Sequence, residues 1–308
     1  MSHPHQTIDL AETLVAMRKQ ESTSYKCHDY LEKLGPKLQD SPRGVSSHGV
    51  HAHDPSDKHF LNPRWREKIC EWYFKMVDHF DFTREIVSIS LSFLDRFLCA
   101  QQQGEERAPT TEPQQAQLAA MSSLHLAVKL YEPRKIKMSS LADLSRGHFT
   151  TEMIERMEQM ILLTLDWRVH PPTPLQFMHL FFKLLPLPEE QKQDFFELAR
   201  FLTELAICDY YFVTEMPSNL AYAAILNALE FRGSHGAAPI SARAVQEFLH
   251  EMLRVAGLHC DSAIVSAART RIREIYLHSA ACPKQGNVLL DSPQGVADRE
   301  NKYNYSEQ

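Results

Sequence analysis

Helical periodicity runs through most of this chain and constrains its fold more than any other feature. Apolar residues recur at spacings of three and four along most segments between residues 63 and 277, and no strand-like alternation lasts long enough to build a sheet. The segment 86–98 is apolar on nearly all sides, which is typical of a central, buried helix. We therefore expect an all-α fold.

The expected helices form two groups of five, separated by the proline-rich sequence 170–174. Thr173 is a predicted N-cap there, and Pro174 occupies the first helical position. Thr83, Thr150 and Ser241 are predicted to cap or start further helices. The first group is expected at 63–80, 86–98, 116–131, 137–145 and 151–166, and the second at 174–185, 189–208, 217–230, 241–256 and 261–277.

Polar, proline-rich and glycine-rich stretches set the remaining boundaries. A further helix is expected within 8–34, residues 35–58 are predicted to be a mobile linker, and 101–115 a loop without regular structure. The expected architecture is one N-terminal helix followed by two tandem five-helix folds. The predicted parts are an N-terminal helix with its linker at 1–61, a first fold at 62–170, a second at 171–277 and a disordered tail at 278–308.

Composition and charge argue against several classes of protein. The formal net charge of −6 argues against a nucleic-acid-binding protein, which usually carries a basic surface. The six cysteines form no CxxC pair, so we expect an intracellular protein without disulfides. The N-terminus lacks the apolar core of a signal peptide, and no stretch reaches the roughly 18 apolar residues of a membrane span, so no membrane association is expected.

The sequence also lacks the motifs that mark common enzymes. It contains no glycine-rich phosphate loop, no GxSxG and no HExxH. A histidine cluster could hold a metal, but its segment offers nothing to orient the rings, so solvated linker histidines are the preferred interpretation. We expect no catalytic residues, no cofactor and no metal. The cluster comprises His48, His51, His53 and His59.

Five fragments in order along the predicted helices resemble the cyclin family. They cover roughly residues 62–277, and the likeness is sharper in the first group. The resemblance implies a cyclin box followed by a second cyclin fold, with a lean towards D-type-like cyclins. The fragments are WREKICEW at 65–72, FLDRFL at 93–98, Leu118 with AVKLYEP at 127–133, RME at 156–158 with LDWRV at 165–169, and TPLQF at 173–177.

The resemblance implies two kinds of site residue. Arg66, Asp95 and Leu118 match structural positions, and we expect Arg66 and Asp95 to be buried together as an ion pair. Lys129 and Glu158 match the pair that meets the main chain of a bound kinase. The nearby apolar residues Leu162, Trp167 and Val169 would supply contact area for the kinase. For Leu162 and Val169, packing in the core remains the alternative.

The sequence departs from the family at the first helix. A substrate-docking patch is expected there, but Lys68 replaces a common aliphatic residue and Lys75 a common acid. Lys75 would repel the basic end of the usual docking motif. Tyr131 also stands where many cyclins have a glutamate. The expected patch comprises Trp65, Ile69, Trp72, Met76 and Gln117.

The resemblance thus implies a nuclear or cytoplasmic regulatory subunit that binds and allosterically activates a cyclin-dependent protein kinase in cell-cycle control, and that is not itself an enzyme. A cyclin-fold transcription regulator or scaffold is the alternative. A helical enzyme is a third hypothesis, which the missing catalytic motifs disfavour. Tight binding to duplex DNA would support the transcription regulator.

Overall fold

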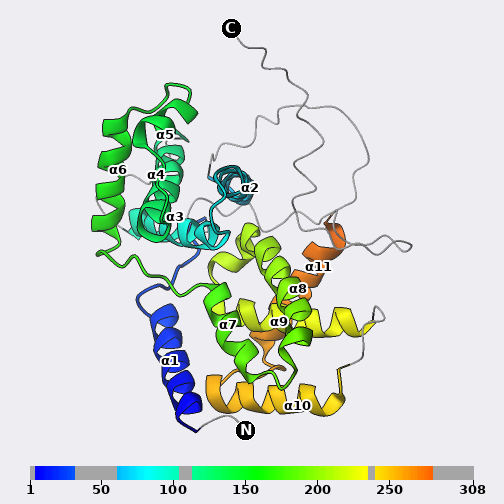
Figure 1. Ribbon diagram of the computed structural model, residues 1–308. Coiled ribbons are helices and arrows are strands. Elements are labelled where there is room, and N and C mark those ends of the chain that lie inside the picture. The colour runs from blue at the N-terminus through cyan, green and yellow to red at the C-terminus, as the bar shows by residue number, and fades with distance from the viewer. Residues whose placement is uncertain (1–3, 32–60, 104–112, 235–239, 280–308) are drawn as a thin grey trace.

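The computed structural model describes residues 4–31, 61–103, 113–234 and 240–279, and every regular element within these ranges is a helix. Figure 1 shows the helices after residue 61 as two groups, α2 to α6 above and α7 to α11 below, with α1 beside the lower group. The predicted all-α fold with two tandem helical groups is confirmed. None of the described helices is long and apolar enough to cross a lipid bilayer.

The first group is built around α3. Its Phe93 and Phe97 are fully buried, and the helix contacts α2, α4 and α6, as expected for a segment that is apolar on nearly all sides. Asn62 and Thr150 each cap a helix by accepting a hydrogen bond from a backbone N–H. The helices are α2 (Pro63–Phe80), α3 (Glu85–Gln103), α4 (Pro113–Tyr131), α5 (Met138–Leu144) and α6 (Thr151–Thr164).

The second group has α9 at its centre, where it contacts α7, α8 and α11 and carries the fully buried Tyr222. Thr173 begins this group with a capping box, since its side chain and that of Gln176 each bond the other's backbone N–H. The elements are α7 (Pro174–Leu184), α8 (Glu189–Cys208), the 3₁₀ turn η2 (Tyr210–Val213), α9 (Pro217–Ser234), α10 (Ala242–Glu251), the π-helical turn η3 (Met252–Ala256) and α11 (Ala263–His278).

Helix α1 (Pro4–Ser22) packs on the second group, against α7 and η3. Leu14 on this helix is fully buried. Glu21, only 2% exposed, accepts hydrogen bonds from the N–H of Ser218 at 2.9 Å and from its hydroxyl at 2.5 Å. Ser218 lies in the first turn of α9, where a carboxylate is favoured by the unpaired N–H groups and the helix dipole. The hydrogen bonds of Glu21 therefore hold the end of α1 against the start of α9.

Several predicted boundaries differ from the structure. The N-terminal helix ends at Ser22 rather than continuing towards residue 34, because the hydroxyls of Ser22 and Thr23 both bond the carbonyl of Lys19. The predicted loop at 101–115 is also too long, since α3 continues to Gln103 and α4 begins at Pro113. The predicted linker 35–58, with its four histidines, and the tail beyond 279 lie outside the described residues.

Candidate functional site

A buried glutamate on α6 contacts two side chains of α4, those of His125 and Lys129. Glu158 Oε2 accepts from Lys129 Nζ at 2.6 Å, and Glu158 Oε1 lies 2.5 Å from His125 Nδ1. Burial alone raises the pKa of the Glu158 carboxyl, but the hydrogen bonds from His125 and Lys129 outweigh it and hold the pKa below its usual range. Glu158 is therefore ionised at neutral pH, and it is paired with Lys129 in the free chain.

Glu158 is buried because it lies on the core-facing side of α6. Residues 154, 157 and 161 are buried beside it on the same face of α6, at helical spacing. Lys129 ends the buried run of α4, and its side chain remains 48% exposed. The pair thus combines one buried carboxylate with one ammonium group that reaches solvent, next to the point where α4 ends.

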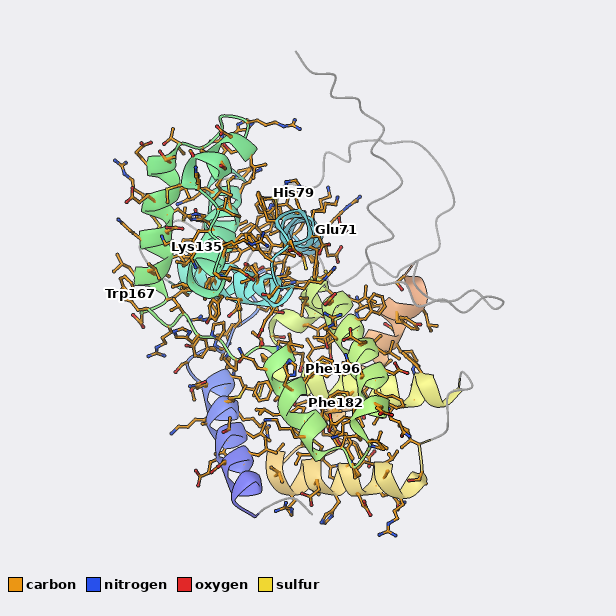
Figure 2. The ribbon with its side chains drawn as sticks, viewed as in Figure 1. Glu71, His79, Lys135, Trp167, Phe182 and Phe196 are labelled. Atoms are coloured by element: carbon orange, nitrogen blue, oxygen red, sulfur yellow. The ribbon has the colours of Figure 1, made fainter. Side chains whose placement is uncertain are left out.

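A strained turn follows α6 and exposes an aromatic side chain. Asp166 and Trp167 both adopt left-handed backbone conformations, with φ values of 51° and 58°. The N–H of Trp167 donates to the carbonyl of Leu162 at 2.9 Å, so that the chain turns back on the helix end. Trp167 is 66% exposed, and Figure 2 shows it pointing outwards from this edge of the molecule. Leu162 and Val169 are half-buried and pack against the core.

Tyr131 holds the segment that follows α6 in place. Its hydroxyl donates to the carbonyl of Val169 at 2.7 Å, and burial raises the pKa of Tyr131 to about 12. Lys135 lies nearby and donates to the carbonyl of Lys129 at 2.9 Å, satisfying the C-terminal end of α4. Figure 2 places Lys135 on the same side of the molecule as Trp167.

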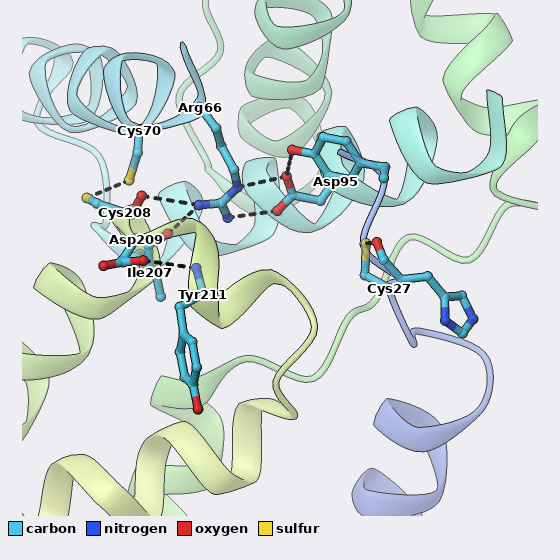
Figure 3. A network of polar contacts seen from close by, with 10 residues as sticks. Cys27, Arg66, Cys70, Asp95, Ile207, Cys208, Asp209 and Tyr211 are labelled. Carbon is cyan, nitrogen blue, oxygen red and sulfur yellow. Dashed lines mark hydrogen bonds and ion pairs between the residues drawn. The ribbon is translucent and has the colours of Figure 1, made fainter. Parts of the chain in front are cut away.

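The structure brings Arg66 and Asp95 together in a buried two-pronged ion pair. Arg66 Nε donates to Asp95 Oδ1 at 2.9 Å, and Nη2 donates to Oδ2 at 2.8 Å. Two contacts that the sequence analysis missed complete the network, since Tyr30 donates to Asp95 at 2.9 Å and Arg66 Nη1 donates to the carbonyl of Ile207 at 2.8 Å. Figure 3 shows the guanidinium between Asp95 and Ile207. The network joins the N-terminal segment, α2, α3 and the end of α8.

Two cysteines lie beside this network. Cys70 of α2 is fully buried, and its Sγ is 2.8 Å from the Sγ of Cys208 at the end of α8 (Figure 3). Both are free thiols. Burial and the hydrogen bond with Cys208 raise the pKa of Cys70 well above its ordinary value. The contact connects the two helical groups.

The residues proposed for substrate docking lie along α2 and the start of α4. Trp65, Ile69 and Trp72 are half-buried and pack against the core, Met76 is buried, and Gln117 is exposed. Lys68 and Lys75 are both exposed on α2, so the positive charge expected on this surface is present. Leu118, one of the expected structural residues, is 7% exposed and lies within the core.

Thr83 does not cap α3 through its hydroxyl as predicted. Its N–H and its hydroxyl both donate to Glu132 Oε1, at 2.8 Å and 2.7 Å. Glu132 is 7% exposed, so this carboxylate joins the end of α4 to the turn before α3. Glu132 therefore makes its contacts inside the first group.

One trio of possible metal ligands occurs within the described ranges. The ligand atoms of His259, Cys260 and Asp261 lie within 4.8 Å of one another in a single turn. The N–H of Asp261 already donates to His259 Nδ1 at 3.2 Å, which occupies that nitrogen. We assign no metal to this turn.

Comparison with known proteins matches both helical groups. The family models described as "Cyclin, N-terminal domain" and "Cyclin, C-terminal domain" match residues 38–170 and 172–253. Cyclin-D3-2 of Arabidopsis thaliana is 28% identical over 250 residues, which cover 78% of this chain and 61% of that protein. The chain spans about half the length of the curated relatives it matches.

Two solved structures share the fold. A viral cyclin from Herpesvirus saimiri superposes with a TM-score of 0.55 at 16% identity, covering 70% of this chain and 87% of that one. A chain in the CAK complex of Chaetomium thermophilum, bound to ATP-gamma-S, superposes with a TM-score of 0.50 at 17% identity, covering 89% and 75%. At such identities the likeness establishes the arrangement of helices.

Proposed function

This chain belongs to the cyclin family, and we propose that it is the regulatory, non-catalytic subunit of a cyclin-dependent protein kinase in cell-cycle control. The observation that carries the proposal is the pairing of Lys129 with Glu158, whose helix α6 leads into the turn that exposes Trp167. Membership of the family and the likeness to a chain of the CAK complex support it. We propose nuclear or cytoplasmic localisation, as expected for such a subunit, and the division at 62–170 and 171–277 as its domain boundaries.

The chemistry of the pair suits a docked main chain. The ammonium of Lys129 can donate to exposed carbonyl groups, and the free lone pairs of Glu158 Oε2 can accept from an N–H group. Trp167 and the half-buried Leu162 and Val169 would add apolar contact area around these polar contacts. Such an arrangement fixes the register of a bound backbone without reading its side chains.

Activation would follow from differential affinity. A subunit that binds the active position of the kinase's mobile helix more tightly than the inactive one shifts the population towards the active state. For a tenfold shift, the two kinase states must differ in binding free energy by about 1.4 kcal/mol. No catalytic group of this chain takes part.

Co-purification with candidate cyclin-dependent kinases, followed by a kinase assay, tests the proposal. The variant Lys129→Ala with Glu158→Ala should lose both binding and activation. The matched control is Arg243→Ala with Glu247→Ala, which removes an exposed ion pair on α10 with a similar separation of 2.8 Å. Unchanged binding in the first variant would exclude this surface, and tight duplex DNA binding without kinase binding would favour a transcription regulator.

A further inference from the structure

His125 is held between two hydrogen-bond acceptors. Its Nδ1 lies 2.5 Å from Glu158 Oε1, its Nε2 lies 3.0 Å from the carbonyl oxygen of Ile136, and the residue is 4% exposed. A backbone carbonyl only accepts, and an ionised carboxylate only accepts. Both ring nitrogens must therefore carry hydrogen, which makes the ring an imidazolium.

The charged groups around this ring come from three segments. Glu158 faces it from α6, Lys129 lies one turn further along α4, and Lys135 reaches from the loop that carries Ile136. Lys135 is engaged with carbonyls at the end of α4, including that of Lys129. Glu158 is thus the one carboxylate in this set, and it is shared by His125 and Lys129.

We propose that His125 is the positioning residue of the kinase-binding pair: a buried, doubly protonated counter-ion that keeps Glu158 charged and oriented when Lys129 leaves it for a partner. This inference rests on the proposed function. A buried carboxylate that lost its only partner would be strongly disfavoured. Because His125 remains in place, the half-exposed Lys129 can swing to a carbonyl of the kinase while Glu158 Oε2 becomes free to accept from an N–H group.

The charge of the ring matters to the pair. A neutral ring with its Nδ1 lone pair towards Glu158 Oε1 would leave the carboxylate without one of its donors. Affinity for the kinase should therefore be higher with the doubly protonated ring than with such a neutral ring.

The protonation of His125 can be measured in the full chain without any kinase. Nitrogen-15 chemical shifts of histidine-labelled protein distinguish protonated from unprotonated ring nitrogens, and comparison with His125→Asn identifies the signals. At neutral pH both nitrogens of His125 should have shifts of protonated nitrogen. A single unprotonated nitrogen would show a neutral ring and overturn the proposal.

The positioning role is tested by kinase affinity measured at several pH values. His125→Asn keeps an N–H group near Glu158 but no charge, so its affinity should fall about tenfold and should vary less with pH than that of the wild type. His250→Asn, an exposed histidine on α10, is the matched control. A folded His125→Asn chain with wild-type affinity and profile would overturn the proposal. If the wild-type chain bound no kinase, the proposed function would fail, and the nitrogen shifts would still decide whether His125 is the counter-ion of Glu158.

Discussion

Tyr30 donates a hydrogen bond of 2.9 Å to the carboxylate of Asp95, 65 residues further along the chain. This contact brings the segment after α1 into the same buried network as the Arg66–Asp95 pair. Desolvation and the nearby Asp95 raise the pKa of Tyr30 well above its ordinary value, so the hydroxyl remains a donor. Substitutions in this network should therefore reduce stability by different amounts.

Asp95→Ala should destabilise the fold by about 3 to 5 kcal/mol, because it leaves the Arg66 guanidinium buried without its carboxylate. Tyr30→Phe should lose less, about 1.5 to 3 kcal/mol, since it removes one hydrogen bond to a charged group. Urea unfolding monitored by circular dichroism measures both. Glu247→Gln, which breaks an exposed pair on α10, should leave the midpoint unchanged. Equal stability of Asp95→Ala and wild type would contradict a structural role for the network.

Glu132→Ala should destabilise the first group by about 1 to 3 kcal/mol, because the N–H of Thr83 loses its acceptor in a part-buried setting. Thr83→Ser keeps both donors and should change stability much less. Thermal unfolding of the two variants gives the comparison. A Glu132→Ala chain as stable as wild type but weaker in kinase binding would instead place Glu132 at the kinase-binding surface.

Trp167→Gly should raise the stability of the chain and lower its affinity for the kinase. Glycine adopts a φ of 58° without strain, so the variant should be more stable by about 1 kcal/mol. The exposed indole would be lost, so kinase affinity should fall if Trp167 is an interface anchor. Calorimetry and a binding assay on the same sample measure the two effects. Reduced stability with unchanged kinase affinity would show that Trp167 serves the fold rather than the interface.

Glu21 should make stability depend on pH. Burial is the main cause that raises its pKa above 4.5 in the folded chain, so the folded state holds this proton more tightly than the unfolded state. In the window from about 4.5 upwards to the folded-state pKa, the contribution of Glu21 to stability therefore falls as pH rises. The difference in unfolding midpoint between wild type and Glu21→Gln, followed across this window, isolates that contribution. A difference that grows with pH in favour of the wild type would have the wrong sign.

Mild oxidation should join Cys70 to Cys208, whose sulfur atoms are 2.8 Å apart. A diamide-type oxidant would take the two thiol hydrogens and become the hydrazine. The reaction should be slow at neutral pH, because the pKa of Cys70 is raised. Non-reducing peptide mapping would detect the cross-link, which should stabilise the chain by about 3 to 5 kcal/mol given its long loop. Cys208→Ser is the control. If the thiols of Cys70 and Cys208 both remained open to alkylation after oxidation, the expectation would be refuted.

Local signals accounted for most of the fold. The caps at Thr150 and Thr173 and the helix start at Ser241 were predicted correctly, because each hydroxyl accepts from a backbone N–H three residues away and needs no distant partner. Helix ends were harder to predict. The end of α1 depends on hydroxyls that compete for the carbonyl of Lys19, and nothing in the apolar pattern records that competition.

The sequence predicted only part of the candidate site and of the buried network. His125 precedes Lys129 by four residues on one helix, a spacing that places both on the same face, and this signal could have found it. The carbonyl of Ile207 carries no sequence signal, since every residue has one. The roles of Lys129, Glu158, Leu162, Trp167 and Val169 in kinase binding stay predictions, as does the docking patch on α2.

The members of the buried network around Arg66 leave the ribosome at very different times. Tyr30 precedes it in synthesis and Asp95 follows soon after, but the carbonyl of Ile207 emerges only after the whole first group and two helices of the second have been made. A nascent chain that stops short of residue 207 holds a cation that still lacks one of its acceptors. Synthesis must pass the end of α8 before the first group has a complete interior.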